Sequence, residues 1–213
     1  MSNKPKVSNA IIRRLPRYRR YLGHLQNKGI KKISSNELSE IIGYTASQIR
    51  QDFNTFVEFG QQGYGYSVDH LYKEINKILG LDREYKTVII GVGNLGQAIT
   101  NYTYYYKIGF NIMGLFDVNP EKIGTKINDI EVRDFKDLKD FCIKEGVDIG
   151  IICVNREGAQ EVADQLAAGG VMGIWNFAPI DLDIPKGVAL ESVHLSDSLH
   201  ALSFMIKSME NEN

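Results

Sequence analysis

The sequence predicts an α/β protein in three parts: a helical N-terminal domain (residues 1–80), a parallel-sheet domain (81–195) and a C-terminal helix (196–213). Two observations predict the first two parts. Apolar residues recur at helical spacing through the first part, and from Lys86 short apolar strands alternate with helical segments. Such alternation is typical of a parallel, doubly wound sheet.

Composition indicates a globular protein and a division of charge. The 213 residues are 43% apolar and 24% charged, which argues against a disordered or fibrous chain. Residues 1–80 hold 13 Lys and Arg against 6 Asp and Glu, a net charge of +7, and the remainder holds 12 against 20, a net charge of −8. This asymmetry indicates that the first domain meets a polyanion, although a solvated helix face would also explain it.

Cysteine usage and the first residues favour the cytoplasm. Cys142 and Cys153 lack the spacing of a zinc site or a disulfide framework, so we expect buried thiols and no metal. The chain begins without the apolar stretch of a signal peptide, and no run approaches the roughly 18 apolar residues that span a bilayer. We therefore expect no membrane partner.

Three helices are predicted in the first domain. The first is basic and amphipathic, ends near Gly29, and has one apolar stripe: Ile11, Leu15, Tyr18, Leu22 and Leu25. Residues 34–37 form a capping box for a second helix, which Gly43 ends. Residues 45–48 form another capping box and open a third helix, whose apolar face is Ile49, Phe53, Phe56 and Val57.

Two helices joined by a glycine turn form a helix-turn-helix, whose second helix enters the major groove of DNA. Gln and Asn can bond adenine, and Arg can bond guanine or phosphate. The glycine-rich residues 60–66 predict a two-stranded wing beside it. The candidate DNA contacts are Ser47, Gln48, Arg50, Gln51, Asn54, Gln61, Gln62, Tyr64, Arg14 and Arg17. A capped surface helix followed by a hairpin need not bind DNA, and that alternative stays open here.

A glycine motif follows the linking helix expected over residues 67–79. Gly91-Val92-Gly93-Asn94-Leu95-Gly96 comes directly after an apolar strand and opens a helix, the context in which GxGxxG holds a pyrophosphate. Asp117 ends the next strand, where its carboxylate can accept the adenosine ribose hydroxyls and repel a 2′-phosphate. The sequence therefore predicts a Rossmann-like domain that binds NADH and NAD⁺ rather than NADP(H), with a nucleotide-free glycine turn as the alternative.

Catalysis is not expected in this domain. The sequence has no Tyr-x-x-x-Lys pair, and His194 and His200 are its only histidines after residue 80. Two alternatives remain: a small NAD-dependent oxidoreductase with an appended basic domain, and a Rossmann module that binds a coenzyme A thioester while the first domain serves assembly. The terminal segment carries Leu199, Leu202, Phe204 and Ile206, too apolar to stand alone, so we expect it to bury against a partner subunit.

Several of these stretches together resemble the Rex family of bacterial redox-sensing repressors. They are Gln48-Ile49-Arg50, Gly63-Tyr64-Gly65-Tyr66, the glycine motif at 91–96, Phe116-Asp117-Val118-Asn119-Pro120 and Asn176-Phe177-Ala178-Pro179. The resemblance implies a winged-helix domain, a Rossmann domain and a helix exchanged within a homodimer. It also implies an AT-rich inverted-repeat operator that is released when NADH binds, with NAD⁺ competing. Tyr102, Asn155 and Phe177 are then expected near the nicotinamide.

The sequence departs from the family pattern at several positions. Gln51, Gln61 and Gln62 stand where basic residues are common, which predicts a shallower salt dependence of DNA binding. His194 stands where an acid is common and, with Arg20 and Tyr102, is a candidate for the switch between states. A histidine there could bond Tyr102 and make the response pH-dependent. An unchanged NADH response of His194→Ala between pH 6 and 8 would remove that hypothesis.

Overall fold

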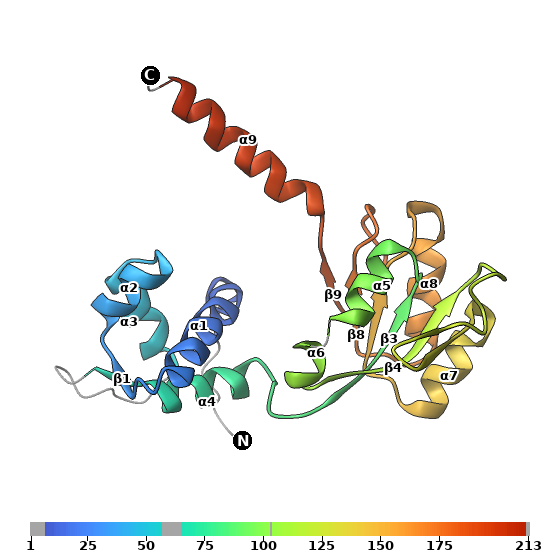
Figure 1. Cartoon of the computed structure of the whole chain (residues 1–213), viewed down its shortest axis with the longest axis horizontal. Helices are drawn as coiled ribbons and strands as arrows, with labels where there is room; N and C mark the ends of the chain where they lie inside the picture. Colours follow the sequence, from blue (N-terminus) through green and yellow to red (C-terminus); the bar gives the residue numbers. More distant parts are fainter. Residues whose placement is uncertain (1–6, 57–64, 103, 212–213) are drawn as a thin grey trace. The chain divides into compact units, whose positions relative to one another are not determined.

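The computed structural model describes residues 7–56, 65–102 and 104–211, and the chain divides into two compact units, residues 1–83 and 84–213 (Figure 1). The division falls three residues beyond the expected boundary before Leu81. Each unit has its own core: one apolar cluster in the first, and one on each face of the sheet in the second.

The first unit is helical with one short pair of strands. Its elements are α1 (Asn9–Asn27), β1 (Lys32–Ile33), α2 (Ser35–Ile42), α3 (Ala46–Asn54), β2 (Tyr66–Ser67) and α4 (Val68–Ile78). The stripe predicted for α1, from Ile11 to Leu25, is buried in every member. Ser34 and Glu37 complete the predicted capping box, and Gly43 ends α2 at φ +70°. These local predictions are confirmed because caps and stripes depend on residues within one turn of each other.

Two details of α3 and the wing differ from expectation. The second capping box is only half formed: Thr45 accepts the N–H of Gln48, but the Gln48 side chain turns to Asp52 instead of capping back. Strand β2 pairs antiparallel with β1, upstream of α2. The expected wing at 60–66 lies mostly outside the described residues, as do Val57, Gln61, Gln62 and Tyr64.

The second unit is a seven-stranded sheet with helices on both faces, in the order β5-β6-β4-β3-β7-β8-β9. All neighbours are parallel except β5 with β6. The elements are β3 (Tyr85–Ile90), α5 (Asn94–Asn101), α6 (Tyr104–Lys107), β4 (Phe110–Asp117), β5 (Lys126–Ile127), β6 (Ile130–Asp134), η1 (Phe135–Asp137), α7 (Leu138–Glu145), β7 (Ile149–Ile152), α8 (Arg156–Ala168), β8 (Gly173–Asn176), β9 (Ala189–Ser192) and α9 (Leu195–Asn211). The predicted doubly wound sheet is confirmed.

Successive side chains of β3 point to opposite faces of the sheet, so their contacts show which helices cover each face. Val88 and Ile90 pack with residues of α7 and α8, whereas Ile89 packs with Ile99 of α5 and with Tyr105 of α6. The order in which successive strands are added to the sheet reverses at β3, because β4 lies on one side of it and β7 on the other. In open parallel sheets, ligands bind at the carboxyl ends of the strands beside such a reversal. The glycine motif follows β3 at that point.

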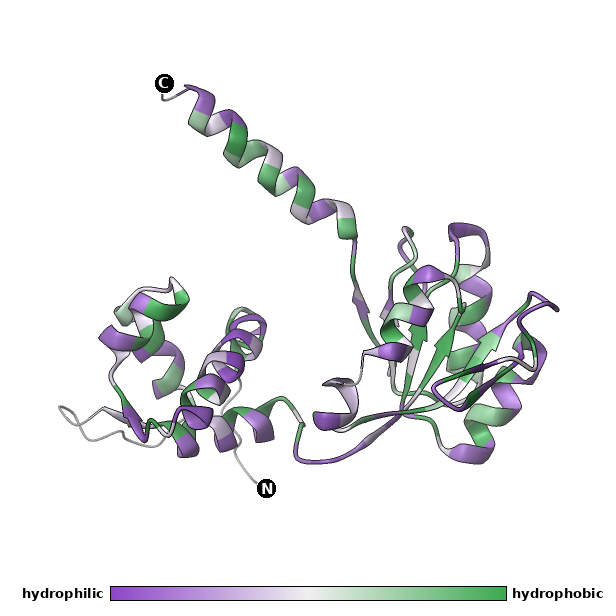
Figure 2. Ribbon diagram, viewed as in Figure 1, coloured by the Kyte–Doolittle hydropathy of each residue, from purple (hydrophilic) through white to green (hydrophobic). Residues whose placement is uncertain are grey.

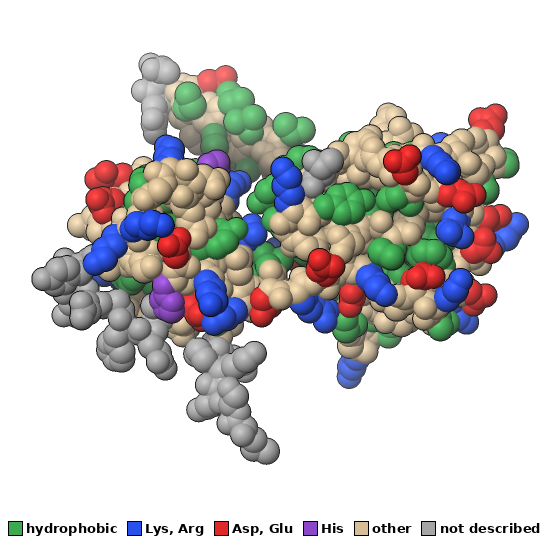
Figure 3. Space-filling model, turned by 60° about the horizontal axis from the view of Figure 1, so that its bottom comes forward, with side chains coloured by type: hydrophobic (Ala, Val, Ile, Leu, Met, Phe, Trp, Pro, Cys, Tyr) green, Lys and Arg blue, Asp and Glu red, His purple; other side chains and the backbone are tan. Residues whose placement is uncertain are grey.

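Helix α9 has no buried residue, although much of it is apolar (Figure 2). Its large apolar side chains are half to nearly three-quarters exposed: Leu195, Leu199, Leu202, Phe204, Met205, Ile206 and Met209. In the space-filling view, these apolar side chains gather along the helix (Figure 3). Among the described residues, no helix is both long and apolar enough to cross a membrane.

Candidate functional site

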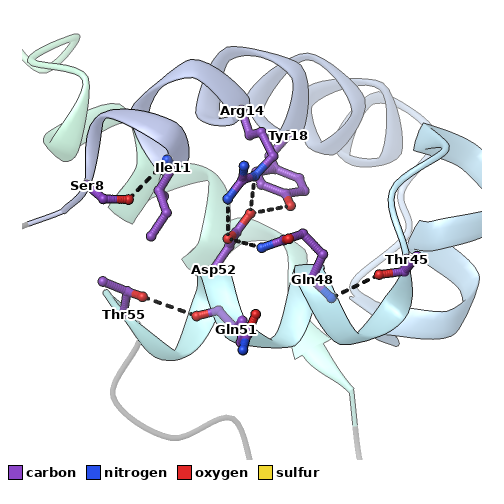
Figure 4. A network of polar contacts seen from close by, with 9 residues as sticks. All are labelled: Ser8, Ile11, Arg14, Tyr18, Thr45, Gln48, Gln51, Asp52 and Thr55. Atoms are coloured by element: carbon purple, nitrogen blue, oxygen red, sulfur yellow. Dashed lines mark hydrogen bonds and ion pairs between the residues drawn. The ribbon is translucent and has the colours of Figure 1, made fainter.

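A buried carboxylate joins α1 to α3 in the first unit. Asp52 is 1% exposed and accepts two hydrogen bonds from Arg14, Nε to Oδ2 and Nη2 to Oδ1, both 2.7 Å (Figure 4). The hydroxyl of Tyr18 donates to Oδ2 at 2.7 Å, and Nε2 of Gln48 donates to Oδ1 at 2.9 Å. Three of these four hydrogen bonds come from α1, so they fix the rotation of α3 against α1, and the bond from Gln48 lies within α3.

The same contacts set the charge of Asp52. Burial alone would raise the pKa of its carboxyl, but the hydrogen bonds from Arg14, Tyr18 and Gln48 and the charge of Arg14 outweigh burial and lower the pKa. The hydrogen bond to Asp52 raises the pKa of Arg14, and burial raises the pKa of Tyr18. The network is therefore an ion pair with a neutral phenol at neutral pH.

The predicted DNA contacts of the first unit fall into two groups, residues that bind Asp52 and residues that are exposed. Arg14 and Gln48 point inward to Asp52, whereas Ser47, Gln51 and Asn54 form an exposed stripe on α3. The Gln51 side chain points away from the network in Figure 4. Residues three and four apart share a helix face, so these three side chains can meet one partner.

Arg50 and Arg17 are exposed cations with one internal contact each. Arg50 Nη1 donates to the Ser35 hydroxyl at 3.0 Å, which ties α3 to the first turn of α2. The Arg17 guanidinium lies 5.1 Å from the ring centre of Tyr44. Both keep further donors for an anion, since a guanidinium carries five N–H groups.

In the glycine loop of the second unit, a side chain would clash at two of the three motif glycines and would fit at the third. Gly91 has φ +89°, and a Cβ there would lie 2.6 Å from the carbonyl oxygen of Cys153. A Cβ on Gly96 would overlap the carbonyl oxygen of Gly91, but a Cβ on Gly93 would meet nothing within 4 Å. Gly93 is the N-cap of α5 and offers no side-chain cap. The N-terminus of α5 therefore has no side-chain cap, and the space in front of Gly93 is open to a ligand that accepts hydrogen bonds from its first N–H groups.

Asp117 joins the end of β4 to this loop. Its Oδ2 accepts the Val92 N–H at 2.9 Å and the Lys122 ammonium at 3.3 Å, and Oδ1 accepts the Asn119 N–H at 2.9 Å. Burial alone would raise the pKa of Asp117, but the bonds from Asn119, Val92 and Lys122 lower it. A carboxylate has about four acceptor positions, so it can still accept a ribose hydroxyl.

An aromatic cluster connects two residues expected near the nicotinamide. Tyr102 packs on Tyr105 with ring centres 5.1 Å apart, Tyr105 on Trp175 at 5.8 Å, and Trp175 on Phe177 at 4.6 Å. Burial raises the pKa of the neighbouring Cys153 thiol to about 12, which makes it inert. Asn155, also expected here, is the N-cap of α8 and accepts the Gly158 N–H.

Two residues that support this site were not among the candidate site residues predicted from the sequence. Asn176 is fully buried at the end of β8, accepts the Ala178 N–H, and donates to Ile180 and to Ser192 of β9. Gln97 donates to the carbonyl of Val92 and supports the glycine loop. A polar residue ending an apolar strand was the available signal for Asn176.

The expected switch residues lie in different units. Arg20 is on α1, with its guanidinium 5.5 Å from the ring centre of Tyr21. Tyr102 is 55% exposed at the end of α5, and His194 is half-buried just before α9. The carbonyl of His194 accepts the Asp197 N–H in the first turn of α9. A pairing among these three side chains stays a prediction.

Known proteins match this chain along nearly its whole length. A redox-sensing transcriptional repressor Rex of Thermoanaerobacter pseudethanolicus is 57% identical over 210 residues, 99% of this chain and 94% of the relative. The chain belongs to the Rex family. Two family models also match: a putative DNA-binding protein N-terminus over residues 6–54 and a CoA binding domain over residues 82–180.

Solved structures extend the Rex-family match to three dimensions. RSP, a Rex-family repressor, in complex with β-NAD⁺ and operator DNA has a TM-score of 0.90 at 56% identity, covering 96% of this chain and 94% of that one. RSP in complex with β-NADH has a TM-score of 0.88 at 54% identity, covering 96% of both chains. The predicted fold class is thus confirmed, and these relatives are repressors rather than enzymes.

Proposed function

We propose that this protein is a transcriptional repressor that binds an AT-rich inverted-repeat operator and leaves it when NADH binds, so that it senses the NADH/NAD⁺ ratio. The observation that carries the proposal is the combination, in one Rex-family chain, of the exposed stripe on α3 with the open loop at Gly93 beside Asp117. A relative that matches nearly the full length of this chain is named a redox-sensing transcriptional repressor.

DNA contact is assigned to the first unit. Ser47, Gln51 and Asn54 face outward from α3, and Gln and Asn can bond the adenine edge in the major groove. Arg50 and Arg17 contact phosphate or guanine, while the expected contacts Gln61, Gln62 and Tyr64 stay part of the proposal. Gln48 and Arg14 are reassigned from direct contact to holding α3, because both are bound to Asp52.

The dinucleotide is assigned to the second unit, whose residues fit it. The pyrophosphate lies against Gly93 and the first N–H groups of α5, and the adenosine ribose hydroxyls are accepted by Asp117. Tyr102, Asn155 and Phe177 lie toward the nicotinamide. The dinucleotide supplies a ring that is cationic when oxidised and neutral when reduced, and an apolar aromatic wall favours the neutral form.

Release by NADH is a linkage effect between the two sites. NADH can remove DNA only if it binds the DNA-incompetent dimer more tightly, and DNA must then weaken NADH binding by the same factor. A homodimer is proposed because the apolar side chains of α9 need a cover, which a second copy supplies. The proposed cellular location is the cytoplasm.

Two rival functions make different predictions. An NAD-dependent oxidoreductase would turn over a carbonyl or alcohol, and the relatives do not support it. A coenzyme A binder is suggested by the name of one family model, but coenzyme A carries a phosphorylated ribose, which the Asp117 carboxylate disfavours. RSP was solved with NADH and NAD⁺, which favours the dinucleotide.

The test is fluorescence anisotropy of a labelled AT-rich inverted repeat with the protein bound, at fixed salt. Titration with NADH should release the DNA, whereas NAD⁺ should leave it bound and shift the NADH curve to higher concentration. Coenzyme A should have no effect. Binding that ignores both dinucleotides would contradict the sensing proposal, and turnover of NADH with a carbonyl substrate would favour the oxidoreductase.

A further inference from the structure

We propose that Lys122 is a second specificity-determining residue of the dinucleotide site, a cation that Asp117 neutralises so that the pair accepts a ribose diol and refuses a 2′-phosphate. This inference rests on the proposed dinucleotide function. It concerns the choice between the phosphorylated and unphosphorylated adenosine ribose.

The first argument is the position of the ammonium. Lys122 Nζ lies 3.3 Å from the Oδ2 atom of Asp117 that also accepts the Val92 N–H of the glycine loop, 2.9 Å away. The cation is therefore held at the end of β4, directly beside the loop that faces the pyrophosphate. An ion pair elsewhere on the surface would not indicate a role in nucleotide binding, whereas this one lies next to the proposed binding loop.

The second argument is the difference in exposure between the partners. The Asp117 side chain is 9% exposed and that of Lys122 34%. The carboxylate is fixed by backbone N–H groups of Val92 and Asn119, whereas the Lys122 ammonium is held through its contact with Asp117. The lysine can therefore turn to another anion if the carboxylate is removed, and the carboxylate cannot turn away from the lysine.

The third argument is the neighbouring surface. Val118, the residue after Asp117, is 74% exposed, an uncommon placement for a β-branched apolar side chain at the end of a buried strand. An apolar surface beside a hydrogen-bonding carboxylate fits a purine next to its ribose. Val118, Asp117 and Lys122 then offer an apolar contact, an acceptor and a cation to one nucleoside.

The chemistry of the pair decides which nucleoside it accepts. A ribose diol donates hydrogen bonds to a carboxylate, but a 2′-phosphate adds about 1.5 to 2 negative charges and is repelled by it. A free lysine beside that position would attract the phosphate, since lysine acts as a point charge for phosphates. Asp117 removes that attraction by holding the ammonium.

The test compares NADH and NADPH binding to four proteins: wild type, Lys122→Gln, Asp117→Ser and the double variant. Binding is followed by the fluorescence anisotropy of the reduced nicotinamide. The wild type should bind NADH at least about 100-fold more tightly than NADPH, because juxtaposed like charges are strongly disfavoured. Asp117→Ser frees Lys122 and should tighten NADPH binding about 10-fold or more, roughly the value of one charge-assisted contact to phosphate.

The double variant decides whether Lys122 is the cause. It should lose the NADPH gain of Asp117→Ser, and Lys122→Gln alone should show none. An NADPH gain that persists without Lys122, or no gain on removing Asp117, would overturn the inference. Asp117→Asn, which keeps an acceptor for the Val92 N–H, repeats the comparison if Asp117→Ser does not fold.

A second readout uses DNA release. NADPH should release operator from Asp117→Ser at lower concentration than from the double variant. If the wild type binds neither dinucleotide, the proposed function itself is wrong. If it binds NADH and the two Asp117 variants respond equally to NADPH, only the role of Lys122 is wrong.

Discussion

Arg14 of α1 and Asp52 of α3 form a two-point ion pair, with both N–O distances 2.7 Å and Asp52 1% exposed. This pair links the first helix of the chain to the helix proposed to read DNA. Its consequences can be measured separately from DNA binding, because the stability of the first unit depends on it.

Replacing Arg14 with Ala should lower the free energy of unfolding of the first unit by about 3 kcal/mol, because the buried Asp52 carboxylate then has no positive charge beside it. Urea unfolding followed by circular dichroism should show the loss. The single tryptophan, Trp175, lies in the second unit, so its fluorescence transition should be unchanged. Arg17→Ala is the matched control: it removes only the exposed contact with Tyr44 and should cost under about 1 kcal/mol.

The ion pair also predicts an acid dependence. Because the pKa of Asp52 is lowered in the folded state, its contribution is fully present above the ordinary Asp value of about 3.9 and is lost as pH falls through the folded value. Asp52→Asn should therefore be much less stable than wild type at pH 7, and the gap should narrow toward pH 3. Thermal melts of the helices by circular dichroism measure it. A gap that stays constant with pH would show that the carboxylate charge is unimportant.

Arg50 should act on DNA rather than on the packing of α2 against α3. Arg50→Ala should weaken operator binding at least about tenfold at fixed salt, and NADH affinity should not change. Ser35→Ala removes the hydrogen bond from Arg50 but keeps the guanidinium, so its operator affinity should stay within about twofold of wild type. Equal losses in the two variants, by anisotropy, would show that the inter-helix bond is what matters.

The glycine loop offers a matched pair of substitutions. Gly93→Ala should fold normally, because its Cβ meets no protein atom within 4 Å, but should weaken NADH binding more than about tenfold by filling the space before α5. Gly96→Ala should destabilise the second unit itself, because its Cβ overlaps the Gly91 carbonyl. Thermal melts and NADH titrations separate the two effects. Tight NADH binding by Gly93→Ala would place the pyrophosphate elsewhere.

The apolar stripe of α9 should hold the homodimer. Leu202→Asp places a charge among Leu199, Ile206 and Met209 and should yield the 24.0 kDa monomer in sedimentation velocity. Ser208→Asp, on the opposite side of the helix, adds the same charge as a control and should leave the dimer intact. A monomeric wild type, or a dimer that survives Leu202→Asp, would contradict the proposed role of α9.

Local features of this fold could be predicted from the sequence, and contacts between elements could not. The stripe of α1 and the cap at Ser34 depend on near neighbours, so spacing was enough. Gln48 and Arg14 were predicted as DNA contacts because Gln48 belongs to the polar side of α3 and Arg14 to the basic helix α1. Asp52 falls between Ile49 and Phe53 on the buried face, and this misplaced charge was the signal that an internal partner existed.

The same limit applies to the short strands β5 and β9. Strand β5 has two residues, too few for a periodic pattern, and pairs with β6 through Asn128 and Asp129, both at positive φ. An Asn-Asp pair between isoleucines indicates a tight hairpin, and that signal was available. Strand β9 has four residues of mixed exposure, and it forms a strand because it pairs with β8. The Asp117 contacts with Val92 and Lys122 likewise depend on tertiary geometry.

The inward position of Gln48 has an evolutionary consequence. Its amide is committed to Asp52 inside the molecule, whereas Ser47, Gln51 and Asn54 take no part in that carboxylate network. Substitutions at the three exposed positions can change which bases are preferred without loosening the helix that carries them. A lineage could therefore acquire a new set of target genes through surface changes alone, while selection for folding keeps residues 14, 18, 48 and 52 together as one unit.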